Sequence, residues 1–389
     1  MTSTLSATQF AINESHRPRL NPLHVPERLL LGPGPSNADP TVIEAMNRQP
    51  IGHLDPAYLA MMDEVQQLLR YTWQTSSLLT YPVAGTGSAA MEATLANVVE
   101  PGDKVLVAVK GYFGHRLVDM AGRYGAEVCT ITKPWGQAFT LEELTAALKA
   151  HDPAVLAIVH AETSTGVRQP LDGLGSACHD QGCLLIADTV TSLGGVPIFL
   201  DEWQIDLAYS CGQKGLSCMP GISPFTMSPR AEEKLAKRQT PVSNWYLDAS
   251  LLRKYWGRER LYHHTAPVNL TYALREALRL LAEEGLAARW QRHQKNAEYL
   301  WAGLAELGLA CHVDPEFRLP TLTTVRVPDG VDAKAVSRTL LNDYNIEIGG
   351  GLGDLAGKVW RIGLMGYNSQ PDNVDTLLRA LGEVLAEQA

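Results

Sequence analysis

Apolar runs and amphipathic stretches alternate along most of the chain after residue 28. Short runs rich in Val, Ile and Leu predict strands over residues 104–110, 127–133, 154–162, 183–190 and 206–211. Amphipathic stretches between them predict helices over 114–125 and 141–152. Because the apolar runs are continuous rather than alternating, both faces of the sheet should be buried. The pattern therefore predicts an α/β fold with a mostly parallel sheet covered by helices.

The pattern also predicts how the chain divides into domains. A long amphipathic helix is expected over 271–284, ending at Gly285 and restarting after it. Beyond this point, strands and helices alternate over shorter distances, at 322–328, 332–343, 346–351, 358–364 and 372–387. Residues 1–27 are polar and contain several Pro and Asn residues. We therefore expect an N-terminal arm over 1–27, a large domain over 28–285 and a smaller C-terminal α/β domain over 286–389.

Charge and composition exclude several classes of partner. The chain has 389 residues, a formal net charge of −9 and no long basic run, so neither nucleic acid nor an anionic membrane is expected as a partner. No apolar run is as long as a membrane span, and the N-terminus lacks the apolar core of a secretory signal. The six cysteines form no C-x-x-C pair and no metal-type spacing. This predicts reduced thiols, no bound metal and a cytoplasmic location.

The stretch VAGTGSAAMEATL (83–95) places a Gly-x-Gly turn directly before a helical run. Thr86, Gly87 and Ser88 are then expected at the helix N-terminus, where backbone N–H groups and the helix dipole attract an anion such as a phosphate. The spacing matches neither G-x-G-x-x-G nor a Walker loop, so it does not indicate a nucleotide or a nicotinamide dehydrogenase. A plain Ser/Thr helix cap explains the same residues.

Two predicted strands end in polar residues. Asp188 directly follows an apolar run, and ligands of open parallel sheets bind beyond the carboxyl ends of the strands. A carboxylate there suits a protonated ring nitrogen, a metal or a hydroxyl, although turn and helix-cap aspartates are common. The stretch HAETSTGV (160–167) ends similarly in Glu162, Thr163 and Ser164. These hydroxyls suit a phenolic or carbonyl oxygen, or an ordinary turn.

Lys214 lies among small residues in YSCGQKGLSCMPG (209–221), after the strand predicted at 206–211. A poorly solvated amine has a lowered pKa and is nucleophilic, as a Schiff-base lysine must be. A surface lysine in a Gly-rich loop is the alternative. An anion cradle, an acid at a strand end and a lysine after the next strand match the phosphate, ring nitrogen and aldehyde of pyridoxal phosphate. The combination therefore predicts this cofactor.

With these motifs the sequence resembles the class V, fold-type I aminotransferases, specifically the alanine–glyoxylate and serine–pyruvate/glyoxylate group. The resemblance extends over nearly the whole chain. It rests on the stretches LLLGPGPSN (29–37), GTGSAAMEA (85–93), HAETSTG (160–166), ADTVTSLGG (187–195), CGQKGL (211–216), YHHTAPV (262–268) and IEIGGGLGDLAGKVWRIGLMG (346–366). It implies the fold-type I architecture of pyridoxal phosphate enzymes, with a large cofactor-binding domain and a small C-terminal domain.

The resemblance implies cofactor contacts residue by residue. Lys214 would form the Schiff base and act as the general acid and base, and Asp188 would pair with the pyridinium nitrogen. Thr163 would contact the phenolic oxygen, and Val190 would pack under the ring. Phe113 would stack over the ring, where relatives often have Trp. The phosphate would be held by Thr86, Gly87, Ser88 and Gln213.

The resemblance also implies substrate and subunit contacts. Arg361 would bind the substrate α-carboxylate, which a guanidinium can do through two parallel hydrogen bonds. Ser36 and Asn37 would line the same pocket. Tyr262 and Thr265 would reach the phosphate of the neighbouring subunit. The implied enzyme is therefore a homodimer with shared active sites.

The implied activity is transfer of an amino group from L-alanine or L-serine to glyoxylate. The reaction would run in two half-reactions, with small amino acids and 2-oxo acids as ligands and glycine as a product. The sequence identifies no second arginine for a side-chain carboxylate, which disfavours a dicarboxylate substrate. Alternatives that stay open are a kynurenine-type transaminase, a lyase, a cysteine desulfurase and a non-catalytic subunit. A desulfurase would need an exposed nucleophilic cysteine.

Overall fold

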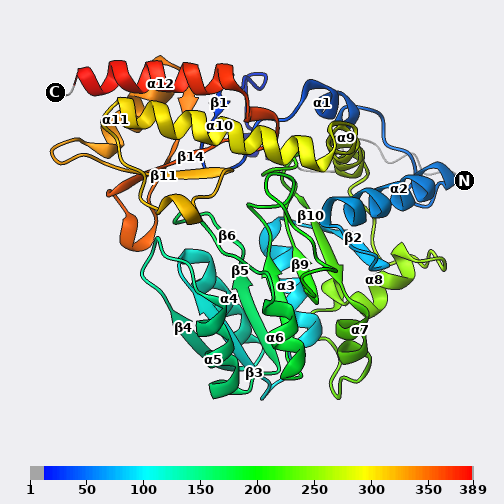
Figure 1. Cartoon of the computed structure of the whole chain (residues 1–389). Coiled ribbons are helices and arrows are strands. Elements are labelled where there is room, and N and C mark those ends of the chain that lie inside the picture. Colours follow the sequence, from blue (N-terminus) through cyan, green and yellow to red (C-terminus); the bar gives the residue numbers. More distant parts are fainter. Residues whose placement is uncertain (1–12, 388–389) are drawn as a thin grey trace, which may run out of the picture.

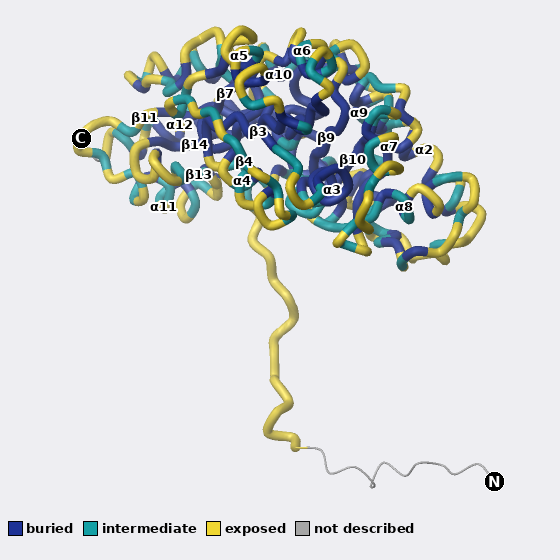
Figure 2. The backbone as a smooth tube through the Cα atoms, turned by 90° about the horizontal axis from the view of Figure 1, so that it is seen from below, coloured by how far each residue is buried: buried dark blue, intermediate teal, exposed yellow. Residues whose placement is uncertain are grey.

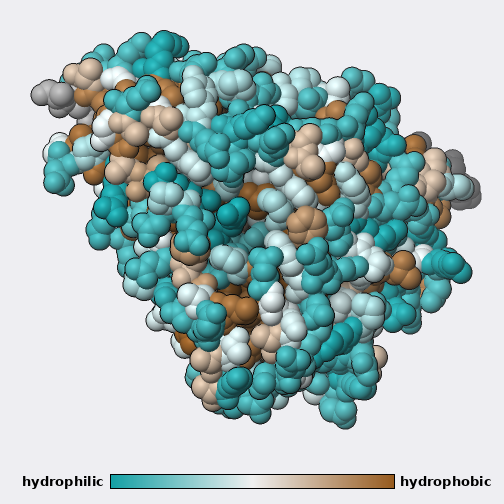
Figure 3. Space-filling view, viewed as in Figure 1, coloured by the Kyte–Doolittle hydropathy of each residue, from teal (hydrophilic) through white to brown (hydrophobic). Residues whose placement is uncertain are grey.

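The computed structural model describes residues 13–387. Residues 13–27 are exposed and extend away from the rest of the chain (Figure 2). The arm predicted over residues 1–27 stays a prediction, and its residues 1–12 lie outside the described residues. No described helix is long and apolar enough to cross a membrane. Hydrophilic side chains dominate the face shown in Figure 3, with apolar residues in small separate groups, as is usual for a surface that faces water.

A seven-stranded sheet forms the centre of the large part of the fold (Figure 1). Its strands follow the order β2 (Leu79–Ala84), β10 (Ile222–Met227), β9 (Leu207–Tyr209), β8 (Leu184–Asp188), β5 (Val155–Val159), β3 (Lys104–Val109) and β4 (Glu127–Thr132). All neighbouring strands from β9 to β4 run parallel, and β10 is antiparallel to both of its neighbours. The predicted mostly parallel sheet is confirmed.

Helices bury both faces of this sheet, as the continuous apolar strands predict. Val105, Val107 and Val109 of β3 share one hydrophobic cluster with residues of α3 and α4. The alternate residues Leu106 and Ala108 belong to a second cluster with residues of α5, α6 and α9. The helices concerned are α3 (Gly87–Val98), α4 (Tyr112–Arg123), α5 (Leu141–His151), α6 (Leu174–Asp180) and α9 (Val268–Glu284).

The C-terminal part of the chain has a core of its own. A three-stranded antiparallel sheet has the order β11 (Leu322–Arg326), β14 (Val359–Gly363) and β13 (Gly349–Gly350). Trp360 of β14 is fully buried in a cluster that also contains Leu31 from the start of the chain. Beside it, β1 (Leu29–Leu30) pairs in parallel with β12 (Ile346–Glu347). The helices of this part are α10 (Leu286–Glu306), α11 (Ala333–Asp343) and α12 (Pro371–Ala386). The domain boundaries stay a prediction.

Helices α9 and α10 meet at Gly285, where the chain was expected to break and restart. Gly285 has φ 80, a backbone conformation that favours glycine. The remaining helices of the large part are α1 (Pro40–Met46), α2 (Pro56–Trp73), α7 (Pro229–Ala236) and α8 (Ala249–Trp256).

Two sheet strands, β2 and β10, are absent from the sequence prediction. Each contains a proline, and Pro82 lies directly opposite Pro224 in the register of the pair. Proline lacks a backbone N–H and weakens a strand pattern in the sequence. Their pairing is therefore a tertiary feature.

Candidate active site

A cavity of about 300 Å³ lies where strands β5, β8 and β9 end. Residues far apart in the sequence line it because parallel strands end at the same edge of a sheet. The lining residues are Gly34, Pro35, Thr86, Gly87, Ser88, Met91, Phe113, Arg116, Val159, Ala161, Thr163, Asp188, Val190, Cys211, Gln213, Lys214 and Pro220. Most of the residues singled out from the sequence as cofactor contacts are thus brought together here.

Lys214 follows β9 and is almost completely buried, with 9% of its surface exposed. Its Nζ donates a hydrogen bond to the Pro33 carbonyl oxygen. Burial lowers the pKa of this amine, and the nearby Arg361 lowers it further, whereas Cys211 and Asp188 act in the opposite direction. The alternative of a solvated surface lysine is therefore wrong. The environment favours a neutral, nucleophilic amine.

Asp188 ends β8 and is 2% exposed. Its Oδ1 accepts a hydrogen bond from the Val190 backbone N–H at 2.8 Å, and its Oδ2 accepts one from the Tyr209 hydroxyl at 2.7 Å. Burial raises the pKa of the carboxyl to about 6, against the opposing effect of these two bonds. Asp188 therefore accepts a hydrogen bond from the turn that follows it, as a turn aspartate does, and it also lines the cavity. Tyr209 was not singled out from the sequence because a tyrosine inside an apolar strand looks like core.

The first turn of α3 faces the cavity with Thr86 at the N-cap position. The Thr86 side chain makes no capping hydrogen bond. The plain Ser/Thr cap suggested as an alternative is therefore not formed by Thr86. The backbone N–H groups at this helix end, which have no partner within the helix, suit an anion.

Gly87 allows a close approach between α3 and the loop after β9. A Cβ atom on Gly87 would lie 3.2 Å from Cys211 Cβ and 3.7 Å from Val190 Cγ2. The first of these distances is tighter than most real Cβ contacts, so the cradle is narrow at this point. Glycine is therefore the residue that leaves room there.

Arg116 is a second guanidinium in this region that sequence reasoning missed. Its Nη1 donates to Ser88 Oγ at 3.1 Å, and its Cζ lies 4.9 Å from the centre of the Phe113 ring. It thus contacts two residues expected to bind the cofactor. The sequence did contain a sign of this contact. Phe113 and Arg116 are spaced i, i+3 on α4, and residues with this spacing share a helix face.

A buried polar group lies behind the cavity at the start of the β6–β7 hairpin (Ala161–Glu162 and Val167–Arg168). Glu162 is fully buried, and its Oε1 accepts hydrogen bonds from Ser164 Oγ at 2.5 Å and from the Ser164 N–H at 3.2 Å. Thr163 Oγ1 hydrogen-bonds Thr191 Oγ1. Lys110 is also fully buried, and burial lowers its pKa to about 8 although Glu162 and Asp188 oppose the shift. Lys110 donates to the Val159 carbonyl oxygen.

Arg361 on β14 is 6% exposed and is not among the residues that line this cavity. Its Nε donates to the Gly350 carbonyl oxygen at 2.7 Å, and its Nη1 lies 3.4 Å from the carbonyl oxygen of Thr163, which lines the cavity. Burial lowers the pKa of the guanidinium to about 10. Arg361 therefore reaches the site from the C-terminal part of the chain.

Ser36 and Asn37 bind main-chain groups, and the residues of their turn that line the cavity are Gly34 and Pro35. Ser36 Oγ donates to the Lys214 carbonyl oxygen at 3.1 Å. Asn37 Oδ1 accepts from the Leu30 N–H at 2.8 Å. Their predicted contact with substrate stays a prediction.

Tyr262 and Thr265 are exposed and are not among the residues that line the cavity of this chain. Tyr262 is 62% exposed and packs beside His53, with 5.4 Å between the ring centres. Their predicted contact with a neighbouring subunit stays a prediction. Among the described residues, no group of three or more His, Cys, Asp or Glu side chains is placed to hold a metal ion.

Comparison with known proteins identifies the family. The family model "Aminotransferase class-V" matches residues 28–377. A solved structure of an alanine–glyoxylate aminotransferase from Nostoc sp. is 69% identical, with a TM-score of 0.96, covering 97% of this chain and 100% of that one. The alanine–glyoxylate aminotransferase of Callithrix jacchus is 46% identical, over 94% of this chain and 89% of that protein. The (S)-ureidoglycine–glyoxylate transaminase of Bacillus subtilis is 39% identical, over 93% and 92%. The chain belongs to the class V aminotransferases.

Proposed function

We propose that this protein is a pyridoxal phosphate-dependent enzyme that transfers the amino group of L-alanine or L-serine to glyoxylate, releasing glycine and the matching 2-oxo acid. The observation that carries the proposal is the convergence of three groups on one cavity: the Lys214 amine, the Asp188 carboxylate and the N-terminal turn of α3. The first group suits an aldehyde, the second a protonated ring nitrogen and the third a phosphate.

The residues present fit this cofactor in size and in polarity. Gln213 Oε1 is buried without a hydrogen-bond partner among the described residues. Burying such an oxygen costs free energy unless a ligand or a bound water donates a hydrogen bond to it. Thr86, Gly87 and Ser88 would hold the phosphate, with Gln213 beside them. Phe113 and Val190 line the cavity and would cover the two faces of the ring. When bound, pyridoxal phosphate supplies an aldehyde for the amino group and a ring that accepts the electrons of the broken Cα–H bond.

Lys214 is the group proposed to move the proton at the substrate Cα. Burial lowers the pKa of this amine, which favours the neutral form of Nζ that can accept a proton and return it. Asp188 would keep a proton on the ring nitrogen by holding a negative charge beside it. Tyr209 and the Val190 N–H fix the direction in which this carboxylate points. Arg361 would bind the substrate carboxylate and so orient the Cα–H bond.

Glyoxylate is proposed as acceptor because it appears in the names of both kinds of relative, whereas the donors named differ. Alanine is the leading donor because the relatives named for alanine are the more similar, at 69% and 46% identity. Arg116 does not make a dicarboxylate substrate more attractive. It lines the cavity, but its Nη1 binds Ser88 Oγ and its guanidinium lies over the Phe113 ring, so we assign it to the cofactor side of the site rather than to a substrate side chain.

The cysteines argue against a desulfurase. Cys211 lines the cavity, but burial raises the pKa of its thiol to about 12. Burial also raises the pKa of the Cys311 thiol. A desulfurase needs a thiolate at neutral pH, and these environments disfavour one. The buried set of Lys214, Asp188 and Arg361 likewise argues against a non-catalytic subunit. A cytoplasmic location and a homodimer with shared sites stay predictions from the sequence.

The test is a spectroscopic titration of the purified protein loaded with pyridoxal phosphate. L-Alanine, L-serine, L-aspartate and (S)-ureidoglycine are added separately, each followed by glyoxylate, while the visible absorption band is recorded. We expect alanine or serine to bleach the band and glyoxylate to restore it. A band that only ureidoglycine bleaches would assign a different donor. A band that glyoxylate never restores would overturn the acceptor, and no band at all would overturn the role of Lys214.

A further inference from the structure

The turn that follows Lys214 is held by residues that do not line the cavity. The Ser217 N–H donates to the Lys214 carbonyl oxygen at 2.9 Å, which closes a tight turn. The next carbonyl, that of Gly215, accepts a hydrogen bond from Arg289 Nη2 at 2.7 Å. Arg289 comes from α10 and is 6% exposed. A buried cation therefore binds the peptide directly after the lysine.

Arg289 binds three separate parts of the chain at once. Besides the Gly215 carbonyl, its Nε donates to the Gly194 carbonyl oxygen at 2.8 Å, and its Nη1 binds Glu284 Oε2 at 2.7 Å. Gly194 lies in the loop after β8, the strand that ends with Asp188, and Gly215 lies in the loop after β9, which carries Lys214. One guanidinium therefore binds the loop that follows Asp188 and the loop that carries Lys214, the two groups proposed to act on the cofactor.

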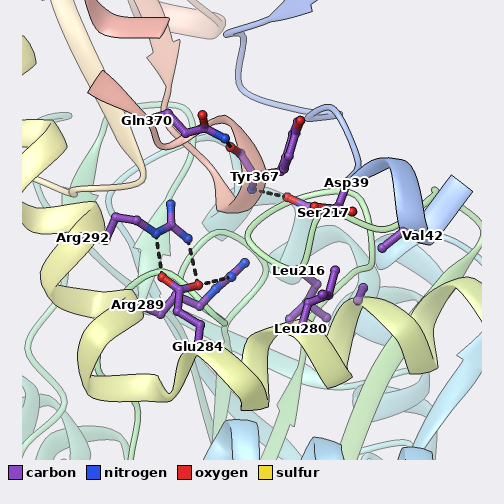
Figure 4. Close-up of a pocket in the computed structure, with 11 residues that line it drawn as sticks. Asp39, Val42, Leu216, Ser217, Leu280, Glu284, Arg289, Arg292, Tyr367 and Gln370 are labelled. Atoms are coloured by element: carbon purple, nitrogen blue, oxygen red, sulfur yellow. Dashed lines mark hydrogen bonds and ion pairs between the residues drawn. The ribbon is translucent and has the colours of Figure 1, made fainter. Parts of the chain in front are cut away.

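Glu284 joins Arg289 to a second arginine, Arg292. Arg292 Nε binds Glu284 Oε1 at 2.6 Å, and its Nη2 binds Oε2 at 3.0 Å, so this pair is bidentate. The remaining Nη1 donates to the carbonyl oxygens of Gly366 at 3.0 Å and Ser369 at 2.6 Å. Figure 4 shows both arginines converging on Glu284 at a second cavity, of about 260 Å³, beside Leu216 and Ser217. The network therefore connects the Lys214 turn with the C-terminal part of the chain.

The segment that Arg292 binds continues directly from the strand that carries Arg361. The helical turn η6 (Gly366–Asn368) follows β14 closely in sequence and packs on the Lys214 turn. Its Tyr367 N–H donates to Ser217 Oγ at 2.7 Å. A Cβ on Gly366 would lie 2.8 Å from the Gly215 carbonyl oxygen, closer than real Cβ atoms approach. The two loops are therefore in tight contact, with no room for a larger residue.

We propose that Arg289 is a positioning residue for Lys214, and that Glu284 and Arg292 couple this position to the strand that carries Arg361. The proposal rests on the roles of Lys214 and Arg361 under the proposed function. The network lies outside the cavity and touches neither cofactor nor substrate. It acts by fixing the peptide after the lysine, so that the amine and the carboxylate-binding guanidinium keep one mutual geometry.

The geometry requires arginine. A guanidinium is planar and always charged, and it directs several N–H donors in a fixed fork. The single ammonium of a lysine cannot reach Gly194, Gly215 and Glu284 together. Arg289 binds the Gly215 carbonyl oxygen and not the Lys214 amine, so it acts on the position of the lysine. The charged and titratable groups that act on the pKa of Lys214 are Cys211, Arg361 and Asp188.

The experiment compares R289K with R279K in the enzyme loaded with pyridoxal phosphate. Arg279 lies on α9 and forms ion pairs with Glu276 and Glu283, both at 2.7 Å, so it is an ion-paired helix arginine like Arg289, but it is more exposed and binds neither loop. For R289K we expect kcat per bound cofactor to fall about 10- to 100-fold with the KM for L-alanine within about 3-fold, because a small misplacement of a catalytic group is costly. The pH midpoint of the visible band, which reports the Lys214 nitrogen, should also shift. R279K should change neither.

Coupling is tested with R292K, because Arg292 binds Gly366 and Ser369 but not Gly215. We expect the KM for L-alanine to rise about 3- to 10-fold as the strand of Arg361 loses its anchor. A KM unchanged from wild type would overturn the coupling. For R289K, a lower melting temperature with unchanged kcat per bound cofactor and an unchanged band would show a structural role only and overturn the positioning role.

If R289K does not accumulate as folded protein, E284Q replaces it, because the amide keeps the shape of the side chain but removes the charge that both arginines bind. E284Q is then expected to shift the band midpoint and to lower kcat, and its failure to do so would overturn the proposal. If the wild-type protein forms no visible band, the proposed function fails first. A wild-type band together with an unaltered R289K band rejects the positioning role alone.

Discussion

Asp188 shows how the environment of one residue sets its chemistry. The carboxyl is buried at a strand end, and burial raises its pKa to about 6 from the ordinary 3.8. Two donors, the Tyr209 hydroxyl and the Val190 N–H, keep it directed into the site. Near neutral pH it is largely ionised, and a bound cation would favour that form further. Without a bound cation, the ionised form of this buried carboxylate lowers the stability of the folded protein.

This cost should appear as a pH dependence of stability in the cofactor-free protein. Because the folded-state pKa of Asp188 is raised, the protonated form is the stable one, and its contribution is lost as the pH rises through about 6. D188N lacks this ionisation. We expect the melting temperature of wild type relative to D188N to fall between about pH 4 and pH 7, by an amount equivalent to up to about 3 kcal/mol. Thermal melts across this range measure it, and a constant difference would contradict the assigned shift.

Lys214 and Lys110 form a matched pair for testing the catalytic amine. Both are buried, but only Lys214 lines the cavity, whereas Lys110 binds the Val159 carbonyl behind it. We expect K214R to lose the visible band and to lower the transamination rate by about 10³-fold or more. K110M should keep the band, since its amine is not the one that reacts. Loss of the band in K110M with retention in K214R would reverse the assignment of the two lysines.

At the scale of elements, the α9–α10 junction is the part most sensitive to the backbone. Gly285 has φ 80, and a Cβ there would meet no atom within 4 Å, so a substitution is opposed by the backbone conformation alone. The same junction carries Glu284 at the end of α9 and places Arg289 at the start of α10. A change of backbone at residue 285 therefore disturbs the network described above.

Two glycine substitutions with opposite expected signs test this conclusion. G285A should destabilise the protein by about 1–2 kcal/mol, because alanine is strained at positive φ. Gly122 lies in α4, where a Cβ also meets nothing within 4 Å. G122A should stabilise the protein by roughly 0.5–1 kcal/mol through helix propensity. Melting temperatures of both variants decide the matter, and equal shifts of the same sign would contradict the argument.

At the scale of the whole molecule, the exposed Tyr262 and Thr265 make the predicted shared site testable. One variant chain carries K214A, and a second carries Y262A and T265A. In a dimer with shared sites, a mixed pair contains one site with both defects and one wild-type site. We expect mixing after unfolding and refolding to restore up to about a quarter of wild-type activity. No gain over the separate variants would mean that each chain builds its site alone.

The sequence by itself determined the order and type of most elements. Continuous apolar strands, helices with capping residues and a glycine at residue 285 are local features, and local physics decides them. Thus Thr140 and Glu143 form a capping box at the start of α5, and β3, β4, β5 and β8 lie close to their predicted ranges. The candidate site followed from position too, since Asp188 ends one strand, Lys214 lies in the loop after the next, and such strand ends converge at one edge.

Only the tertiary structure decided how distant segments meet. The pairing of β2 with β10 places Pro82 opposite Pro224, and a proline inside each segment weakens its strand pattern in the sequence. Arg116, Tyr209 and Arg289 look from the sequence like a helix surface, a core residue and a helix surface. Each acquires its contact from a partner far along the chain, Ser88, Asp188 and Gly215 respectively. Such contacts depend on how the elements pack together, which is a property of the whole fold and of no single stretch of sequence.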